Sequence, residues 1–245
     1  MKCYFRLTSD FEEWLWTSAL KRDISFALRV AAEVCLTLGV LVALFVGYEL
    51  LWTSHVTGEA QREAASSLQR AWIPPPPSTP STPSSKGVPA DPAPKLGEPF
   101  AMLRIPRLGD AWQWAVYEGV RRDDLRKGPG HYPDTARPGQ VGNVVIAGHR
   151  TTNGEPFAHL DRLRNGDQLV LETASRRVVY RVDAAEIVPP TRISVLLPVP
   201  NKPGAKPTQA HLTLVTCHPR WGSTSRLITY TTLVSSTPRR LPGKV

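Results

Sequence analysis

Cysteine is scarce in this chain, with only three among 245 residues, at positions 3, 35 and 217. So few cysteines exclude a small domain held together by several disulfides. Cys35 lies in a long apolar run, residues 30–52, whereas Cys3 precedes this run and Cys217 lies far beyond it. If the run spans a membrane, the three thiols are separated by the bilayer and cannot pair. The part beyond the run then depends on its core for stability, and its unpaired thiol indicates a reactive group.

Clusters of metal-ligating side chains are also lacking. His149 has no second ligand at a useful spacing. The acidic residues are scattered along the chain instead of being grouped as a calcium site requires. We therefore expect neither a metal nor another cofactor.

Sequence patterns of nucleic-acid-binding modules are missing as well, although the chain is basic. Residues 95–245 carry 22 Lys and Arg against 12 Asp and Glu. No zinc finger, helix-turn-helix or aromatic platform accompanies this charge, so we do not expect nucleic acid as a partner. The charge indicates attraction to anionic wall polymers and lipid head groups, and an ordinary solvated face is the alternative.

The apolar run Val30 to Trp52 is the one long hydrophobic stretch. Its 23 residues would extend roughly 35 Å as a helix, enough to cross a bilayer core. Glu33 and Glu49 lie within about one turn of its ends, where carboxylates reach the interface at modest cost. Basic residues are concentrated before the run, at positions 2, 6, 21, 22 and 29. This asymmetry predicts a single-pass protein of the cell membrane, with residues 1–29 in the cytoplasm and the remainder outside.

Residues 53–94 separate this run from the remainder of the chain. Residues 53–71 are polar with a weak helical pattern, and residues 74–94 contain nine prolines. Such a composition cannot bury enough apolar surface to fold by itself. We assign residues 53–94 to an extracellular linker whose semi-rigid part holds the following domain, residues 95–245, away from the membrane. A proline-rich ligand for a binding module is the alternative.

The domain at residues 95–245 is predicted to be mainly β. Short β-branched runs separated by turn residues predict strands, and helical signals are few: one helix near residues 155–163 and one turn near 123–127. Seven or eight strands in this length predict a closed or nearly closed, antiparallel-rich barrel. The strand ranges are 100–105, 112–117, 143–148, 167–173, 176–188 (possibly broken near Asp183), 211–217 and 226–234.

One predicted strand ends in a thiol and the next begins with a guanidinium. HLTLVTC alternates apolar and polar residues up to Cys217, Pro219 and Gly222 then interrupt the chain, and a second run begins at Arg226. A thiolate is a strong nucleophile, but a cysteine needs a proton acceptor to react near neutral pH. Cys217 alone is equally well explained as a small buried hydrophobe.

Histidine is the usual proton acceptor for such a thiol, and His149 has the most suggestive setting. The run NVVIAGH delivers its imidazole at the end of a predicted strand. His218 adjoins the thiol, but neighbouring strand residues point to opposite faces, which argues against it. The combination of His149, Cys217 and Arg226 predicts catalysis by an activated cysteine.

These residues and their flanking segments resemble the sortases, transpeptidases that attach proteins to the cell wall of Gram-positive bacteria. TLVTC is followed by Arg226, and AGHR with His149 lies upstream. Residues 128–157 and 213–228 are most similar to the class E sortases of actinobacteria. The resemblance covers about residues 98–235 and implies the eight-stranded sortase β-barrel, preceded here by one transmembrane helix and a proline-rich linker.

The resemblance also implies a mechanism. Cys217 attacks the Thr carbonyl of a sorting signal of the form Leu-Ala-x-Thr-Gly or Leu-Pro-x-Thr-Gly, expels the Gly amine and forms a thioester. An amine of a peptidoglycan precursor, similar to lipid II, then accepts the surface protein. His149 transfers the protons. Arg226 stabilises the oxyanion, positions the substrate or favours the thiolate, and the sequence leaves these three roles open.

Two further residues and one loop are expected to contact the substrate. Thr216 precedes the nucleophile, and a plain β-forming role is the alternative for it. His131 lies in the matching GPGHYP segment, and a structural role is the alternative there. Residues 188–209, rich in proline, correspond to the sortase loop that forms one wall of the substrate groove.

Two other functions remain open from the sequence. The L,D-transpeptidases of peptidoglycan cross-linking also use Cys, His and Arg, but their nucleophile typically follows Ser-x-Gly, whereas Thr216 precedes Cys217 here. A membrane-tethered module that binds peptides without catalysis is the second. A thioester adduct with a sorting peptide would separate all three.

Overall fold

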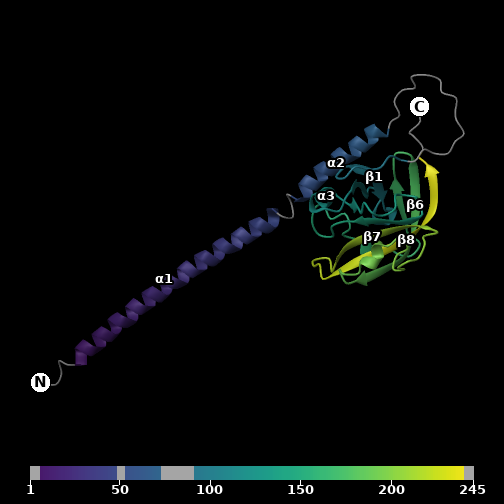
Figure 1. Cartoon of the computed structure of the whole chain (residues 1–245). Helices are drawn as coiled ribbons and strands as arrows, with labels where there is room; N and C mark the ends of the chain where they lie inside the picture. The colour runs from purple at the N-terminus through teal and green to yellow at the C-terminus, as the bar shows by residue number, and fades with distance from the viewer. Residues whose placement is uncertain (1–5, 49–52, 73–90, 240–245) are drawn as a thin grey trace, which may run out of the picture. The chain divides into compact units, whose positions relative to one another are not determined.

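The computed structural model describes residues 6–48, 53–72 and 91–239. Two units, divided after Glu49, make up the chain (Figure 1). The first contains α1 (Arg6–Gly47), in which Phe26–Gly47 is long and apolar enough to cross a membrane, with a mean hydropathy of 2.3. The predicted span began at Val30, so the apolar helix starts one turn earlier, and the predicted end at Trp52 lies outside the described residues. Cys3 also lies outside them.

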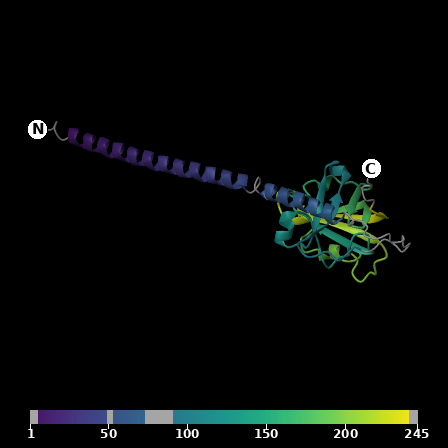
Figure 2. The same ribbon diagram turned by 90° about the horizontal axis from the view of Figure 1, so that it is seen from above.

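The second unit is built on a barrel of strands (Figures 1 and 2). The barrel is closed, and its strands follow the order β1-β2-β3-β4-β7-β8-β6-β5. The predicted eight-stranded barrel is therefore confirmed. Most neighbours are antiparallel, but β2 pairs with β3 and β4 pairs with β7 in parallel. The strands are β1 (Pro99–Arg104), β2 (Gln113–Glu118), β3 (Gly130–His131), β4 (Gly142–Ala147), β5 (Gln168–Glu172), β6 (Arg176–Val188), β7 (Ala210–His218) and β8 (Ser225–Pro238).

Alternating side chains of these strands fill the barrel, because each strand turns every second residue inward. Tyr180 is fully buried, and its hydroxyl accepts a hydrogen bond from the Gly139 amide at 2.9 Å. The break considered near Asp183 is a register irregularity within one continuous β6. The apolar core consists mainly of Leu103, Ile105, Val144, Ile146, Phe157, Leu160, Leu169, Leu171, Val178, Leu212 and Leu214.

The helices of the barrel are short, and one differs from the prediction. The turn near residues 123–127 is α3 (Arg122–Lys127). The helix expected over residues 155–163 is wrong, because only the 3-10 turn η3 (Leu160–Arg162) forms there. Asn153, Gly154 and Glu155 all have positive φ, and Glu155 precedes a proline, which disfavours helical backbone. Two other 3-10 turns are η2 (Pro106–Leu108) and η4 (Ile193–Leu196).

Residues 53–71, assigned above to the linker, form α2 (Thr53–Ala71) and pack on the outside of the barrel. Ala64, Leu68 and Trp72 recur at four-residue spacing on one helix face and are buried in a cluster with Met102, Ala115 and Tyr117. The Gln61 side chain accepts from the Ala115 amide at 2.7 Å and donates to the Lys127 carbonyl at 2.8 Å. This helix therefore belongs to the folded domain.

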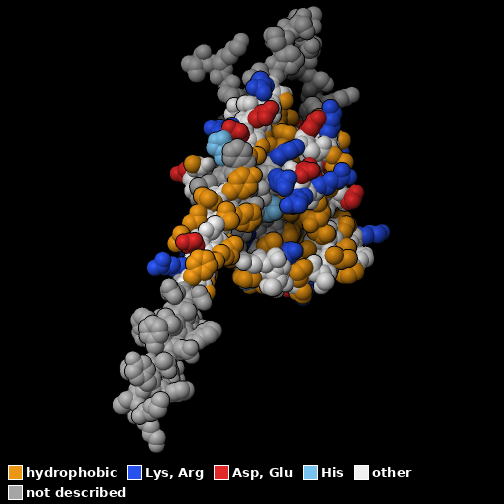
Figure 3. Space-filling model, turned by 90° about the vertical axis from the view of Figure 1, so that its left-hand side faces the viewer, with side chains coloured by type: hydrophobic (Ala, Val, Ile, Leu, Met, Phe, Trp, Pro, Cys, Tyr) orange, Lys and Arg blue, Asp and Glu red, His pale blue; other side chains and the backbone are white. Residues whose placement is uncertain are grey.

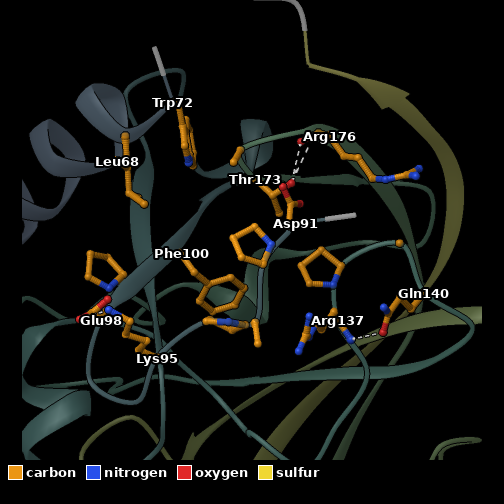
Figure 4. A pocket seen from close by; sticks show the side chains of 18 residues that line it. Leu68, Trp72, Asp91, Lys95, Glu98, Phe100, Arg137, Gln140, Thr173 and Arg176 are labelled. Atoms are coloured by element: carbon orange, nitrogen blue, oxygen red, sulfur yellow. Dashed lines mark hydrogen bonds and ion pairs between the residues drawn. The ribbon is translucent and has the colours of Figure 1, made fainter. Parts of the chain in front are cut away.

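The chain on both sides of residues 73–90 contacts the barrel. Arg239 donates from Nη2 to the Trp72 carbonyl at 3.0 Å, and the Ser175 amide donates to Asp91 Oδ1 at 2.8 Å. Trp72 and Asp91 line one cavity of about 510 Å³, into which Leu68 and Phe100 also point (Figure 4). Because α2 docks on the barrel, residues 53–71 belong to the folded domain and not to the linker. Residues 73–90 of the predicted proline-rich spacer lie outside the described residues, so its role of holding the domain away from the membrane stays a prediction.

A cut between residues 73 and 90 is expected to leave two pieces that co-purify. A specific protease site placed in this segment of the full chain, in detergent, provides the cut. The α2 contacts hold the pieces together, since Leu68 is only 5% exposed. Leu68→Asp should release the piece that begins near Asp91, because losing the buried leucine costs about 2–5 kcal/mol and a carboxylate is placed in the cluster.

Val56→Asp serves as the matched control, because Val56 lies on the same helix and is 46% exposed. This variant should retain both pieces after the cut. Separation of the pieces in the unsubstituted chain would contradict the docking of α2.

Candidate active site

His149, Cys217 and Arg226 lie at the same end of three neighbouring strands. In the parallel pair β4 and β7, Ala147 is opposite Val215, and the Gly148 amide donates to the Val215 carbonyl at 3.1 Å, so His149 follows the end of β4 next to the end of β7 that carries Cys217. In the antiparallel pair β7 and β8, Cys217 is directly opposite Arg226. Directly opposed residues have Cβ atoms about 4.5–5.5 Å apart. The structure therefore brings the three predicted catalytic residues into one row.

The position of His149 depends on the residues around its backbone. The Phe157 amide donates to the His149 carbonyl at 3.0 Å. A Cβ on Gly148 would lie 2.6 Å from the Phe157 ring, so only glycine allows this close approach. Burial lowers the pKa of His149 below its usual value, which favours the neutral imidazole at neutral pH. A neutral imidazole is able to accept the proton of a thiol.

Cys217 is a half-buried free cysteine. The next side chain, His218, points elsewhere, because its Nδ1 lies 3.0 Å from Arg150 Nη1. This agrees with the expectation that neighbouring strand residues face opposite sides, and His149 stays the predicted proton acceptor for the thiol. Sequence reasoning did not single out Arg150.

Arg226 is held by the loop that joins β7 to β8. Its Nη1 donates to the carbonyls of Ser223 and Ser225, both at 2.9 Å. Its other nitrogen atoms have no hydrogen-bond partner within the described parts of the chain, so they remain able to donate to a bound substrate. Burial raises the pKa of Tyr132 and the charge of Arg226 partly offsets this, which places Tyr132 within electrostatic reach of the site.

Thr216 is only 2% exposed, and its hydroxyl donates to the Gly148 carbonyl at 2.8 Å. The hydroxyl therefore links β7 to the chain just before His149. This contact favours the structural role for the Thr216 hydroxyl, and a contact of Thr216 with the substrate stays a prediction.

His131 is 1% exposed, with Nδ1 at 2.8 Å from Glu118 Oε2 and Nε2 at 3.0 Å from Thr135 Oγ1. Thr135 already donates its hydroxyl proton to the Tyr132 carbonyl at 2.7 Å. Nε2 also lies 3.0 Å from the Ala136 carbonyl, so hydrogen bonds hold the buried ring at both of its nitrogen atoms. This burial argues against direct substrate contact and favours a role in fixing the chain around Tyr132.

No group of three or more His, Cys, Asp or Glu able to hold a metal occurs among the described residues. The cavity in Figure 4 is lined by none of the three residues of the row, so it is separate from the candidate active site. Lys and Arg side chains gather on the barrel face shown in Figure 3. Attraction of this face to anionic polymers stays a prediction.

Comparison with known proteins identifies related chains. The Sortase domain family model matches residues 103–234. Sortase SrtE1 of Streptomyces coelicolor is 37% identical over 223 residues, which is 87% of this chain and 59% of that protein. The chain thus spans little more than half the length of this curated relative.

Two solved structures are similar as well. The structure of sortase E from Streptomyces avermitilis is 43% identical, with a TM-score of 0.54, over 59% of this chain and 93% of that one. The structure of sortase E1 from Streptomyces coelicolor, with a tripeptide in its active site, is 37% identical, with a TM-score of 0.54, over 58% of this chain and 92% of that one.

Proposed function

Because this chain belongs to the sortase family of cysteine transpeptidases, we propose that it is a membrane-anchored class E sortase. It cleaves a sorting signal between Thr and Gly and transfers the Thr carbonyl to an amine. The observation that supports this proposal is the position of Cys217 directly opposite Arg226, with His149 just beyond the end of the neighbouring strand β4. Neither a metal nor a cofactor is needed for this chemistry.

The neutral imidazole of His149 sets the order of proton transfers. As Cys217 Sγ attacks the Thr carbonyl carbon, the thiol proton passes to His149. The imidazolium then gives this proton to the departing Gly amine, and a thioester remains. The acceptor amine attacks the thioester and loses a proton to His149. The tetrahedral intermediate formed by the amine then collapses and releases the Cys217 thiolate. The thiolate takes the proton back from the His149 imidazolium, so the enzyme is regenerated without net change.

Arg226 supplies the positive charge in this row. Two loop carbonyls fix its Nη1, so the orientation of the guanidinium plane is set before substrate arrives. Its remaining N–H groups donate to the carbonyl oxygen that becomes negative as Sγ attacks. Donors fixed in advance stabilise such a charge more than mobile ones, because no reorganisation is needed during the reaction.

The segment after β6 forms one wall of the groove for the sorting signal. Asn143 donates from Nδ2 to the carbonyls of Val195 and Leu197, at 3.0 and 3.1 Å. Asn201 donates from Nδ2 to the Tyr230 hydroxyl at 2.8 Å. These contacts hold the wall in place before a peptide binds, which reduces the entropy lost on binding. Similarity to class E enzymes favours Leu-Ala-x-Thr-Gly over Leu-Pro-x-Thr-Gly.

The partners follow from this activity. The substrates are surface proteins that carry the sorting signal, and the acceptor is the amine of a peptidoglycan precursor similar to lipid II. Phe26–Gly47 anchors the enzyme in the cell membrane. The basic residues before it keep the N-terminus in the cytoplasm, and the barrel lies outside.

Mass spectrometry of the full chain in detergent with sorting peptides tests the activity. Incubation with a Leu-Ala-x-Thr-Gly peptide is expected to give an acyl adduct on Cys217, and added small amines should convert it to a Thr–amine product. The matched Leu-Pro-x-Thr-Gly peptide should react more slowly. Peptide binding without an adduct would indicate the silent module, whereas reaction only with peptidoglycan stem peptides would indicate an L,D-transpeptidase.

A further inference from the structure

Arg150 follows the catalytic histidine directly and is almost completely buried, at 4% exposure. Its Nη1 donates to the Cys217 carbonyl at 3.3 Å and contacts His218 Nδ1 at 3.0 Å. Its Nη2 donates to Asp161 Oδ1 at 2.9 Å. One guanidinium therefore connects the nucleophile's own backbone with a residue of η3.

These contacts lie directly behind the catalytic row. Cys217 and His218 are neighbours in β7 and point to opposite faces, so the contact between Arg150 and His218 lies on the side of β7 away from the Cys217 thiol. The β4 ladder ends at Ala147, so the backbone of His149 lies beyond the last regular strand pair. Beyond the last backbone pair of β4 and β7, the Arg150 side chain connects this part of the chain to the end of β7 by its hydrogen bond to the Cys217 carbonyl.

We propose that Arg150 is a positioning residue, which holds the strand end of His149 and the strand end of Cys217 at the separation that proton transfer requires. The inference rests on the proposed transpeptidase function. A planar guanidinium donates in fixed directions to several acceptors at once, whereas lysine offers a single flexible point of charge. Two of the acceptors of Arg150 belong to the end of β7 and the third, Asp161, belongs to η3. The planar guanidinium, with its two terminal nitrogen atoms, is therefore the group that joins these two segments.

Stability alone does not explain this buried arginine. Its Nε has no hydrogen-bond partner among the described residues, and the carboxylate of Asp161 is 55% exposed. A buried charge with an unused donor is a poor source of stability, and an apolar side chain of similar length often replaces such a group at little cost. Arg150→Met is therefore expected to fold, which makes the proposal testable by kinetics.

The test measures kcat and KM of the full chain in detergent for the sorting peptide and an amine. Arg150→Met should lower kcat by about tenfold to a hundredfold, because small displacements of reacting groups cost that much, and should change KM by less than about twofold. Arg150→Lys keeps the charge but not the fork, and it should show most of the same loss. Arg177→Met, which removes a charge from the pair with Glu172 on distant strands, is the matched control and should keep the normal rate.

Asp161→Ala removes the carboxylate that accepts the hydrogen bond of Arg150 Nη2 and should therefore also lower kcat. Residues that act through one link show non-additive losses. The double variant Arg150→Met with Asp161→Ala should therefore be no slower than Arg150→Met alone. The alkylation rate of Cys217 should stay within about threefold in all of these variants, since the thiol is retained and only its partner is displaced.

Full activity in Arg150→Lys would show that charge alone matters and would overturn the proposal. Normal kcat in Arg150→Met would do the same. If Arg150→Met does not fold, Asp161→Ala provides the test instead. An unchanged kcat in Asp161→Ala would then refute the positioning role of the contact between Arg150 and Asp161. If the unsubstituted chain forms no thioester, the proposed function fails instead, so the two failures are distinguished.

Discussion

Cys217→Ala is expected to abolish transpeptidation, with kcat reduced by more than about 10⁴-fold. The reaction proceeds through a bond to Sγ, and no other cysteine follows residue 35 in the sequence. His149 and Arg226 remain in this variant, yet neither forms a covalent intermediate with the substrate. The measurement is product formation from the sorting peptide together with intact-protein mass spectrometry, which should show no acyl adduct.

Cys35→Ala is the matched control, because Cys35 lies exposed on α1 and outside the barrel unit. This variant should turn over at the normal rate and accept one acyl group. A thiol alkylator should inactivate it through modification of Cys217, whereas modification of Cys3 should leave the rate unchanged. Residual transpeptidation in Cys217→Ala, above the background without enzyme, would refute the assigned nucleophile.

Arg226→Lys is expected to lower kcat/KM on the order of a hundredfold, equivalent to roughly 3 kcal/mol. Arg226 is opposite Cys217, and two loop carbonyls fix its Nη1. Lysine cannot satisfy those carbonyls and still present fixed donors to the reacting carbonyl. The measurement is kcat/KM for the sorting peptide, compared with the rate of Cys217 alkylation across the same pH range.

The comparison separates two roles of Arg226. If its donors act on the oxyanion, alkylation of Cys217 should change far less than turnover. Equal losses in both rates would instead show that Arg226 acts through its field on the thiolate. Near-normal turnover in the lysine variant would show that directed hydrogen bonds are not required at all.

The strands were predictable because their pattern is local. β7, for example, alternates apolar and polar residues up to the thiol, and its observed bounds lie within one residue of those expected. β3 has only two residues, Gly130–His131, so no periodicity exists to reveal it. The grouping of His149, Cys217 and Arg226 was likewise predictable, because each of them lies at or just beyond one end of a recognisable strand.

Features that depend on distant partners were not predictable. The docking of α2 relies on Gln61, a polar residue whose hydrogen bonds go to the backbone at Ala115 and Lys127. Nothing in a polar side chain indicates which distant carbonyl it contacts. Arg150 was missed for the same reason, since a basic residue is normally expected at the surface and its burial follows only from the folded strand ends.

The docking of α2 also fixes where the residues on either side of the proline-rich segment lie. Trp72 and Asp91 both contact the barrel, so residues 73–90 have both ends fixed on one body. The entropy of closing such a loop grows only logarithmically with its length, and doubling it costs about 0.6 kcal/mol. Insertions or deletions there leave residues 48–52, the connection between α1 and α2, unchanged. The length of the proline-rich segment is thus free to vary without altering the tether of the enzyme.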